Sequence, residues 1–520
     1  MSAFAGEELP AELAARLARD PVAGFTLFRQ HNVANNAQLR ALTGALQAAA
    51  RPDARPLLIA ADQEGGQLIG MGDETTQFAG AMALGAVADD DLAERVGRAV
   101  GRELRALGIN VNYASVCDLA TNPANPGLGI RSFGDDPVAA GRLAAATVRG
   151  LQAEGVAATA KHFPGNGDGA VDTHDRLAVV RRSRPEFGER ELVPFRAALA
   201  AGARLVMSGH FALPEVTGDE SLPATLSSVV MTDLLRGELS FDGLAITDAL
   251  DMKALAQGGA QIVDVIAALR AGQDLLLGTA DPLSLDMAES GVRQALLRGL
   301  VDPGAIVASA QRLATLRAWL ATFEQPDLAV VGCTDHVALA QELAARSVTL
   351  VRNDERLLPL RPPNDGRVAV IMPSPADVTR ADTSSYVAPG LATAIRRRHP
   401  ATDEFVTGHR PAAAEIAALR STLGDYDVLV VATLCAHSEP AQAEMVAAVL
   451  SLDVPTITLA LRTPWDLDAY SNATTHACSY GILPPTIEAL AAALFGEMPF
   501  AGHLPVSIAG LYERGHGLVS

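Results

Sequence analysis

The chain has 520 residues, too many for one ordinary hydrophobic core, and the usual range of domain sizes predicts two or three domains. Apolar residues make up 49% of the sequence and charged residues 19%, so we expect a globular protein with large cores. The formal net charge of -19 argues against nucleic acid as a partner, because an acidic protein repels the phosphate backbone.

The amino-terminal segment MSAFAGEELPAEL lacks a basic stretch followed by an apolar core, and no apolar run approaches about 18 residues. We therefore expect no membrane span and a cytoplasmic location. The four cysteines lie far apart without CxxC spacing, which argues against a disulfide framework and a zinc ribbon.

Short apolar runs alternate with longer amphipathic segments through the first three fifths of the chain, a pattern typical of parallel strands joined by crossover helices. The expected strands are 24–28, 56–62, 110–116, 156–163, 204–210, 243–249 and 274–278. Seven such units over about 300 residues favour a (β/α)8 TIM-type barrel over an open sheet. The eighth strand, if it exists, has to be the stub Ser2-Ala3-Phe4-Ala5, which is short enough to suggest a truncated amino terminus or an incomplete barrel.

The rhythm changes near Phe323. A helix over 336–346 is followed by strands at 348–351, 367–371, 428–433 and 456–461, interleaved with helices. We predict a barrel domain over 1–322 and a carboxyl-terminal α/β sandwich domain over 323–520.

Polar residues gather where the predicted barrel strands end. They are Asp62, Asn112, Asp118, Lys161, His162, His210, Thr247 and Asp248. Because the carboxyl ends of barrel strands form the rim on which active sites are built, we expect a catalytic pocket there.

The stretch KHFPGNGDGAVDTH, residues 161–174, allows three interpretations. Phosphate binding is disfavoured, because the glycine spacing matches neither a dinucleotide loop nor a Walker loop. A metal site is compatible with the histidines and aspartates, although they lack the close spacing of known zinc motifs. Proton chemistry requires only that Asp172 orient the imidazole of His174, which it can do if the triplet 172–174 is extended and both side chains point to one side.

Asp248 favours the third interpretation, because it ends a buried strand at the predicted rim, where an unpaired charge is costly. A rim carboxylate together with an acid/base group on a glycine-rich loop suits double displacement at a glycosidic carbon. In that scheme Asp248 attacks the sugar, while His174 first protonates the leaving oxygen and then activates water.

The same residues resemble a known family. KHFPGNGDGAVDTH is similar to the signature of the β-N-acetylglucosaminidase branch of glycoside hydrolase family 3, and ITDALDM (246–252) resembles the family's nucleophile segment. The resemblance continues through ADQEGGQ (61–67), GIRSFGDDP (129–137), VMSGHFALP (206–214), RSVTLVRN (346–353), LRTPWDLDAY (461–470) and FAGHLPVSIAGLY (500–512).

The resemblance implies that Asp248 is the nucleophile and that His174 and Asp172 are the acid/base dyad. It also implies that Asp62, Arg131, Lys161 and His162 hold the sugar of the innermost subsite, with His210 and Met252 as weaker candidates for the pocket wall. Since this branch keeps its acid/base dyad in the barrel, the second domain is expected to be structural. Asn166, Gln67 and Gly70 depart from residues common in the branch, which are a histidine and two arginines.

The leading expectation is therefore a retaining exo-β-N-acetylglucosaminidase that acts on a small carbohydrate and needs no cofactor or metal. The alternatives are a phosphorylase of the same glycosides, since a histidine acid/base does not repel phosphate as a carboxylate would, a metal-dependent hydrolase at the barrel rim, and a sugar-binding protein without catalysis.

Overall fold

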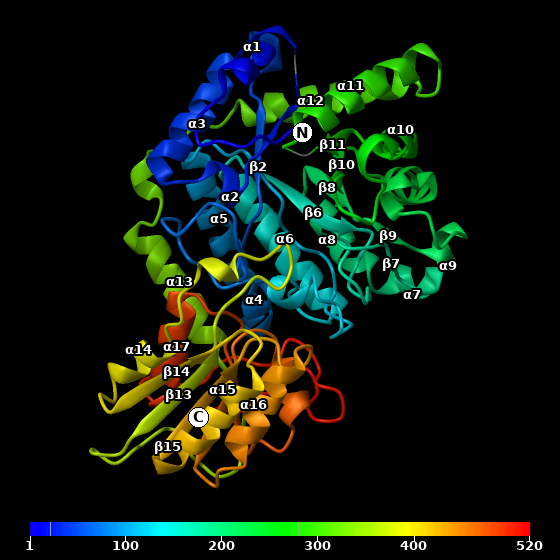
Figure 1. Ribbon diagram of the computed structural model, residues 1–520. Helices are drawn as coiled ribbons and strands as arrows, with labels where there is room; N and C mark the ends of the chain where they lie inside the picture. Colours follow the sequence, from blue (N-terminus) through cyan, green and yellow to red (C-terminus); the bar gives the residue numbers. More distant parts are fainter. Residues whose placement is uncertain (21, 279, 520) are drawn as a thin grey trace.

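The computed structural model describes residues 1–20, 22–278 and 280–519, and it has two lobes (Figure 1). The larger lobe contains a sheet of seven parallel strands in chain order, as the sequence predicts. They are β1 (Gly24–Thr26), β2 (Leu58–Ala61), β5 (Val111–Asn112), β6 (Ala157–Phe163), β8 (Leu205–Ser208), β10 (Leu244–Ala249) and β11 (Leu275–Leu277).

The amino-terminal stub lies between the first and last strands of this sheet. Ser2 forms a parallel bridge with Phe25, its N–H donating to the Gly24 carbonyl at 3.0 Å, and the Gly278 N–H donates to the Met1 carbonyl at 2.8 Å. The predicted eighth position is thus occupied by a single bridge at Ser2 rather than by a four-residue strand. The barrel is nearly closed.

The barrel strands are buried on both sides. Leu58 and Ala60 of β2 pack with Met207 and Ile246 inside the barrel, whereas Ile59 and Ala61 pack against the surrounding helices. This alternation follows from the two-residue repeat of a strand, and it explains why the strand sequences are continuously apolar.

Helices cover the outside of the barrel. They are α1 (Ala11–Arg19), α2 (Arg29–Asn32), α3 (Asn36–Ala49), α4 (Ala81–Val87), α5 (Asp90–Ala106), α6 (Pro137–Ala153), α7 (Arg184–Glu189), α8 (Leu192–Ala200), α9 (Pro214–Thr217), a π-helix (Val229–Glu238), α10 (Gln261–Ala271), α11 (Pro282–Leu297) and α12 (Pro303–Leu320).

Side-chain caps start several of these helices, for example Asp89 before α5 and Asp136 before α6. The α5 and α6 backbones approach closely, because a Cβ at Gly150 would lie 2.3 Å from the Glu94 carbonyl.

Two short strand pairs lie outside the main sheet of the barrel. They are β3 (Gln63–Gly65) with β4 (Leu68–Ile69), and β7 (Ala178–Val179) with β9 (Phe211–Ala212). The β3–β4 pair directly follows β2 at the rim of the barrel.

The smaller lobe is a three-layer α/β sandwich, as predicted. Its sheet has the order β12 (Thr349–Asn353), β17 (Thr475–Cys478), β16 (Thr456–Ala460), β15 (Val428–Thr433), β13 (Val368–Pro373) and β14 (Thr402–Thr407), with β12 antiparallel. The helices are α13 (Thr334–Ser347), α14 (Leu391–Arg396), α15 (Ala413–Thr422), α16 (Pro440–Leu450) and α17 (Pro484–Leu494).

Alternate residues of the sheet build its two cores. In β15, Val430 packs on the side of α14 and α17, whereas Val431 packs on the side of α15 and α16. The sequence did not indicate β14 or β17.

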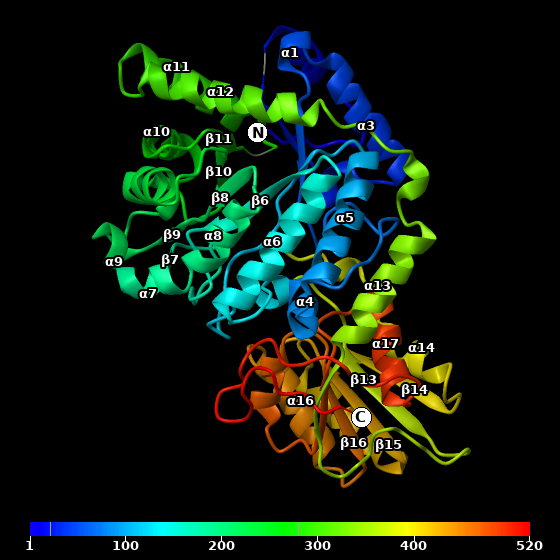
Figure 2. The ribbon, with the colours of Figure 1, turned by 180° about the vertical axis from the view of Figure 1, so that it is seen from behind.

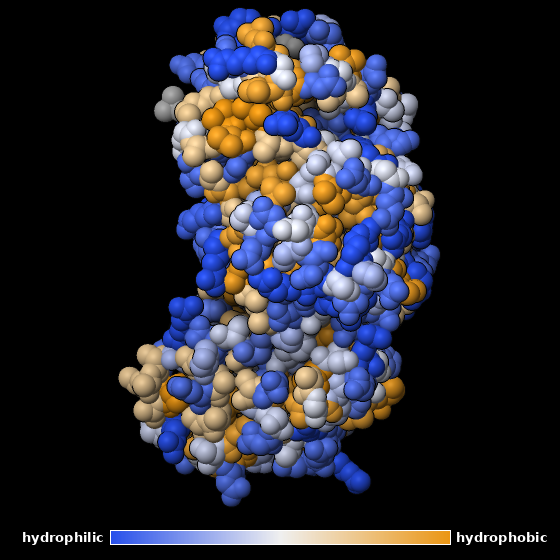
Figure 3. Space-filling view, turned by 90° about the vertical axis from the view of Figure 1, so that its right-hand side faces the viewer, coloured by the Kyte–Doolittle hydropathy of each residue, from blue (hydrophilic) through white to orange (hydrophobic). Residues whose placement is uncertain are grey.

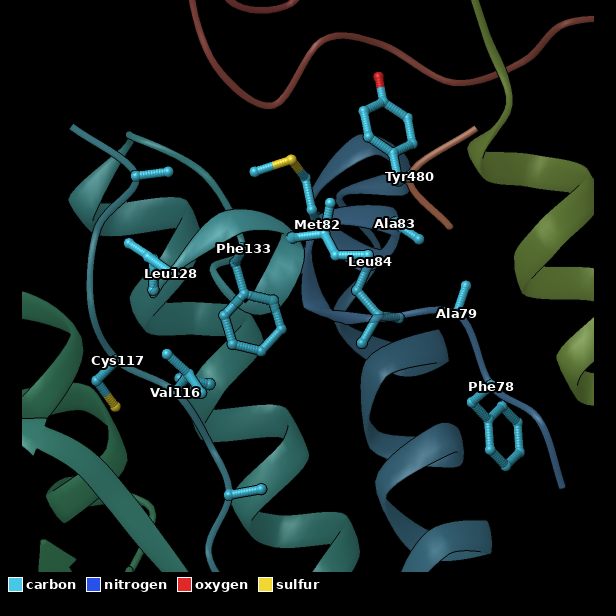
Figure 4. Packing of buried hydrophobic residues seen from close by; sticks show 14 of the residues in the cluster. Phe78, Ala79, Met82, Ala83, Leu84, Val116, Cys117, Leu128, Phe133 and Tyr480 are labelled. Carbon is cyan, nitrogen blue, oxygen red and sulfur yellow. The ribbon is translucent and has the colours of Figure 1, made fainter. Parts of the chain in front are cut away.

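The two lobes are joined through α13, which runs beside α4 and α17 (Figure 2). The buried Glu103 of α5 accepts hydrogen bonds from His336 Nδ1 at 2.8 Å and from the Gly332 N–H at 3.0 Å. Tyr480 of the smaller lobe lies beside Met82 and Ala83 of α4 (Figure 4). A buried carboxylate and an apolar contact therefore fasten the lobes together.

Hydrophobic and hydrophilic residues are interspersed on the face shown in Figure 3. Within the described ranges, none of the helices is both long and apolar enough to cross a membrane.

Candidate active site

A cavity of about 580 Å³ opens at the carboxyl ends of the barrel strands. All seven site residues predicted from the sequence line it, namely Asp62, Arg131, Lys161, His162, Asp172, His174 and Asp248. Residues far apart in the chain meet here because parallel strands end at the same edge of a barrel.

Lys161 forms the centre of a charge network on the cavity floor. Its Nζ lies 2.6 Å from Asp62 Oδ1 and 2.6 Å from Glu64 Oε1. Arg131 forms a bidentate pair with Glu64, at 2.8 Å from Nε to Oε2 and 2.9 Å from Nη2 to Oε1. Glu64 thereby fixes two of the predicted sugar-binding cations, and Asp62, the more exposed carboxylate, remains accessible to a ligand.

Glu64 was not predicted as a site residue, although it lies in the segment ADQEGGQ. Burial alone would raise its pKa, but the charges of Arg131 and Lys161 outweigh burial and hold the pKa of Glu64 well below its usual range. Burial likewise opposes the charge of Lys161, yet Asp62 and Glu64 raise the pKa of that ammonium group. Glu64, Lys161 and Arg131 are therefore all charged at neutral pH.

Replacing Glu64 with glutamine is expected to lower the free energy of unfolding by about 3–5 kcal/mol, because it leaves two buried cations short of a counter-charge. Because the pKa of Glu64 is lower in the folded protein than in the unfolded chain, its ionisation stabilises the fold at pH values above the unfolded pKa of about 4.3. This stabilisation is lost as the pH falls toward and through the folded pKa. The difference from wild type should therefore shrink below about pH 4. Denaturant unfolding at several pH values measures it.

The matched control is Glu220→Gln, which breaks the exposed pair with Arg181 and should change stability little. Equal effects of the two substitutions would contradict the role assigned to Glu64.

His162 is oriented by a second carboxylate that the sequence placed at a strand end. Asp118 Oδ2 accepts from His162 Nδ1 at 2.6 Å, and Asp118 Oδ1 accepts from the Asn166 N–H at 2.7 Å. The other ring nitrogen, Nε2, lies 4.0 Å from Asp248 Oδ2 and 3.5 Å from Arg131 Nη2. Asp118 thus turns the ring of His162 toward the centre of the cavity.

Asp248 lies near the end of β10, where its Oδ1 accepts from the Ala249 N–H at 2.8 Å. Burial opposes its charge, but the neighbouring His162, His210 and His174 outweigh burial and lower the pKa of this carboxyl. Asp248 is therefore ionised at neutral pH, as a nucleophile must be.

His210 is buried beneath this segment. Its Nδ1 lies 2.9 Å from Thr225 Oγ1 and its Nε2 donates to the Ala249 carbonyl at 3.1 Å. Burial lowers the pKa of this histidine. Both ring nitrogens have protein partners, so His210 positions the chain after Asp248. Met252 is also buried and forms part of the wall.

His174 and Asp172 form a hydrogen-bonded dyad. Asp172 Oδ1 lies 2.8 Å from His174 Nδ1 and also accepts the His174 N–H at 2.9 Å. Burial opposes the charge of Asp172, yet its hydrogen bonds from His174 hold the pKa of the carboxyl below its usual value. With Nδ1 engaged, Nε2 is the ring nitrogen available for proton transfer.

The extended conformation considered for residues 172–174 is not the one they adopt. They form a turn in which the Asp172 carbonyl accepts from the N–H groups of Asp175 and Arg176, at 3.0 and 3.2 Å. An aspartate readily bonds a backbone N–H two residues ahead, so the side chains meet through this local turn rather than across an extended strand.

The loop that carries the dyad is fitted closely to its neighbours. A Cβ at Gly167 would lie 1.9 Å from the Leu119 carbonyl, so only glycine fits there. The Asn125 amide donates to the Asn166 carbonyl at 2.7 Å, and the Lys253 N–H donates to the His174 carbonyl at 3.2 Å. These contacts place the dyad over the cavity.

Two of the three positions that depart from the family pattern, Gly70 and Gln67, have identifiable structural roles. Gly70 is required, since a Cβ there would lie 2.3 Å from the Asp62 carbonyl. Gln67 Oε1 accepts from Arg462 Nη2 of the smaller lobe at 2.7 Å. Asn166 binds Asp118 through its backbone, whereas its buried Oδ1 has no hydrogen-bond partner among the described residues.

The arrangement therefore combines an ionised carboxylate, an aspartate-oriented imidazole and a polar floor suited to sugar hydroxyls. In the part of the chain that the structure describes, no three His, Cys, Asp or Glu side chains cluster as metal ligands.

Comparisons with known proteins agree with this arrangement. Residues 5–316 match the glycosyl hydrolase family 3 N terminal domain, and residues 348–514 match the glycosyl hydrolase family 3 C-terminal domain. A glycoside hydrolase family 3 β-N-acetylglucosaminidase from Paenibacillus sp. str. FPU-7 superposes with a TM-score of 0.91 at 33% identity, covering 98% of this chain and 97% of that one.

Two further relatives are similar in sequence. Beta-hexosaminidase A from Pseudoalteromonas piscicida is 36% identical over 70% of this chain, and the match spans 65% of that relative's length. A beta-N-acetylglucosaminidase/beta-glucosidase from Cellulomonas fimi is 32% identical over 87% of this chain and 83% of its own length.

Proposed function

Because this chain belongs to glycoside hydrolase family 3 and is a glycoside hydrolase, we propose that it is a retaining exo-β-N-acetylglucosaminidase that removes terminal β-linked N-acetylglucosamine. The observation that carries the proposal is the pairing of the ionised Asp248 with the Asp172–His174 dyad in one cavity. The names of the relatives support the choice of sugar.

In the first step, an Asp248 oxygen attacks the anomeric carbon as the bond to the leaving oxygen breaks. Protonated His174 transfers its Nε2 proton to that oxygen, and Asp172 stabilises the imidazolium beforehand and keeps Nδ1 protonated afterwards. The products of this step are a covalent glycosyl-enzyme and a free alcohol. Asp62, Lys161, Arg131 and His162 hold the sugar hydroxyls on the floor of the cavity.

In the second step, the now neutral His174 takes a proton from water as the water oxygen attacks the anomeric carbon. The ester bond to Asp248 breaks, the carboxylate is restored and His174 is protonated again. Two displacements at the same carbon leave the anomeric configuration unchanged.

The sugar specificity is tested with paired chromogenic substrates. We expect kcat/KM for p-nitrophenyl N-acetyl-β-glucosaminide to exceed that for p-nitrophenyl β-glucoside by about tenfold or more. A site that forms hydrogen bonds with the N-acetyl group binds a glucoside less well, because the glucoside lacks that group. Release of nitrophenol measures both. Turnover of the glucoside without turnover of the N-acetylglucosaminide would overturn the proposal.

Phosphorolysis is a second candidate, because the acid/base group is an imidazole, which does not repel an incoming phosphate as a carboxylate would. Formation of a sugar 1-phosphate, with a rate that depends on phosphate, would favour it. Identical rates and products with and without phosphate would exclude it, and unchanged activity after chelation would exclude the metal-dependent alternative.

A further inference from the structure

The second domain supplies part of the cavity wall. The segment 377–386 lies between β13 and α14 and reaches from the smaller lobe to the barrel, as the yellow chain in Figure 1 shows. Seven of its residues line the cavity, namely Asp377, Thr379, Arg380, Ala381, Asp382, Thr383 and Tyr386. This wall segment faces the same space as Asp248 and His174.

The wall segment is hydrogen-bonded to the barrel at its centre. The Thr383 N–H donates to the Gln67 carbonyl at 2.8 Å, and the Ile69 N–H donates to Thr383 Oγ1 at 3.0 Å. Gln67 lies in the turn between β3 and β4, Ile69 is the last residue of β4, and β3 carries Glu64 of the cavity floor. The wall segment is therefore bonded to the same strand pair that carries part of the floor.

A buried ion pair fixes the same segment from the other side. Arg462 donates to Asp382 Oδ2 at 2.8 Å and to Gln67 Oε1 at 2.7 Å, and both charged side chains are almost fully buried. Since an unpaired buried charge is costly, this junction of three side chains holds the wall segment in one place. Gln67, which departs from the family pattern, accepts a hydrogen bond from the guanidinium of Arg462 through its side-chain oxygen.

Three cavity-lining residues of the wall segment are exposed, namely Asp377, Arg380 and Tyr386. Asp377 is engaged within the segment, where its carboxylate accepts from the Ser385 N–H at 2.8 Å and from the Ser385 hydroxyl at 2.7 Å. Arg29 of the barrel lies 3.9 Å from the centre of the Tyr386 ring and is paired with Asp73 at 2.8 Å, so its charge is already engaged. Arg380, in contrast, is exposed and forms no hydrogen bond or ion pair with any residue in the described ranges. A guanidinium has five N–H donors and no acceptor, so its natural partner is a group rich in oxygen acceptors.

The shape of the cavity determines where the leaving group lies. Asp62, Lys161 and His162 close the floor, where the terminal sugar is held, and the exposed residues Arg380 and Tyr386 mark the mouth. A group that departs after protonation by His174 has to lie between the floor and the mouth, beside the wall segment.

We propose that the wall segment forms the leaving-group subsite and that Arg380 is a specificity-determining residue that donates hydrogen bonds to the oxygen atoms of a sugar leaving group. This inference rests on the proposed function for the identity of the terminal sugar. It replaces the expectation that the second domain is only structural.

The test compares two substrates that differ only in the leaving group, N,N'-diacetylchitobiose and phenyl N-acetyl-β-glucosaminide. Loss of a charge-assisted hydrogen bond in Arg380→Ala should lower kcat/KM for the disaccharide roughly tenfold or more, mainly through KM, and should change the value for the phenyl glycoside less than about twofold. Tyr386→Ala should shift the ratio in the same direction. The matched control is Arg420→Ala, which removes an exposed arginine of α15 that does not line the cavity.

An unchanged ratio in Arg380→Ala would overturn the inference, as would an equal loss on both substrates. If wild type hydrolyses glucosides but no N-acetylglucosaminide, the proposed function fails, and the same ratio measured with cellobiose and phenyl β-glucoside still decides the role of Arg380.

Discussion

Replacing Asp248 with asparagine is expected to lower kcat/KM by a factor on the order of 10⁴ or more, because the first displacement then lacks its nucleophile. Asp248 is suited to this role because it lies near the end of its strand, has a lowered pKa and has Oδ2 4.0 Å from Nε2 of His162. The loss should appear in kcat as well as in kcat/KM, since Asp248 acts on the reacting carbon. Initial rates on p-nitrophenyl N-acetyl-β-glucosaminide measure it.

Two controls make this result specific. Asp233→Asn removes an exposed carboxylate outside the cavity and should leave the rate near that of wild type. In the wild-type enzyme, a 2-deoxy-2-fluoro sugar should trap the glycosyl-enzyme, and peptide mass analysis should find the label on Asp248. A label on another carboxylate, or no label with full activity in Asp248→Asn, would contradict the assignment.

Replacing His174 with alanine is expected to lower kcat/KM for an unactivated glycoside by about 10²–10⁴-fold, the usual contribution of general acid–base catalysis. The loss should be much smaller for a 2,4-dinitrophenyl glycoside, whose leaving oxygen departs without a proton. Asp172→Asn should show the same dependence on the leaving group, because Asp172 fixes the Nδ1 proton of His174 and stabilises its charged form.

His503→Ala serves as the matched control, since His503 is exposed in the second domain away from the cavity. A uniform loss across leaving groups in His174→Ala would indicate a binding or folding role and would contradict its assignment as the acid/base residue.

The barrel could be predicted because its strands carry a strong and regular signal. Each strand is buried on both faces, so it reads as a continuous apolar run between helices. The strands β14 and β17 of the second domain gave no such signal. The edge strand β14 has the sequence TDEFVT with exposed acidic residues. The strand β17 is the four-residue run THAC, whose short sequence alone does not distinguish a strand from a loop.

The site was predictable where a residue's position along its strand determines its role. Asp248 and Lys161 project from strand ends, and the rim of a barrel collects such residues. The supporting carboxylates were harder to find, because their partners are distant: Glu64 binds Arg131 67 residues away, and Asp118 binds His162 44 residues away. The conformation at Asp172 could not be decided from the sequence, because an aspartate and a histidine two residues apart can meet either in an extended segment or in a local turn.

The attachment of the two lobes limits how substrate can enter and product can leave. Hinge opening at the linker would break the contacts of Glu103 with His336 and Gly332 and separate Tyr480 from Met82. The segment around His174, in contrast, is held to the chain after Asp248 by the Lys253 N–H and one exposed ion pair of 3.5 Å. Because the cavity already opens to solvent at the mouth beside Arg380 and Tyr386, substrate can enter and product can leave while both lobes stay attached.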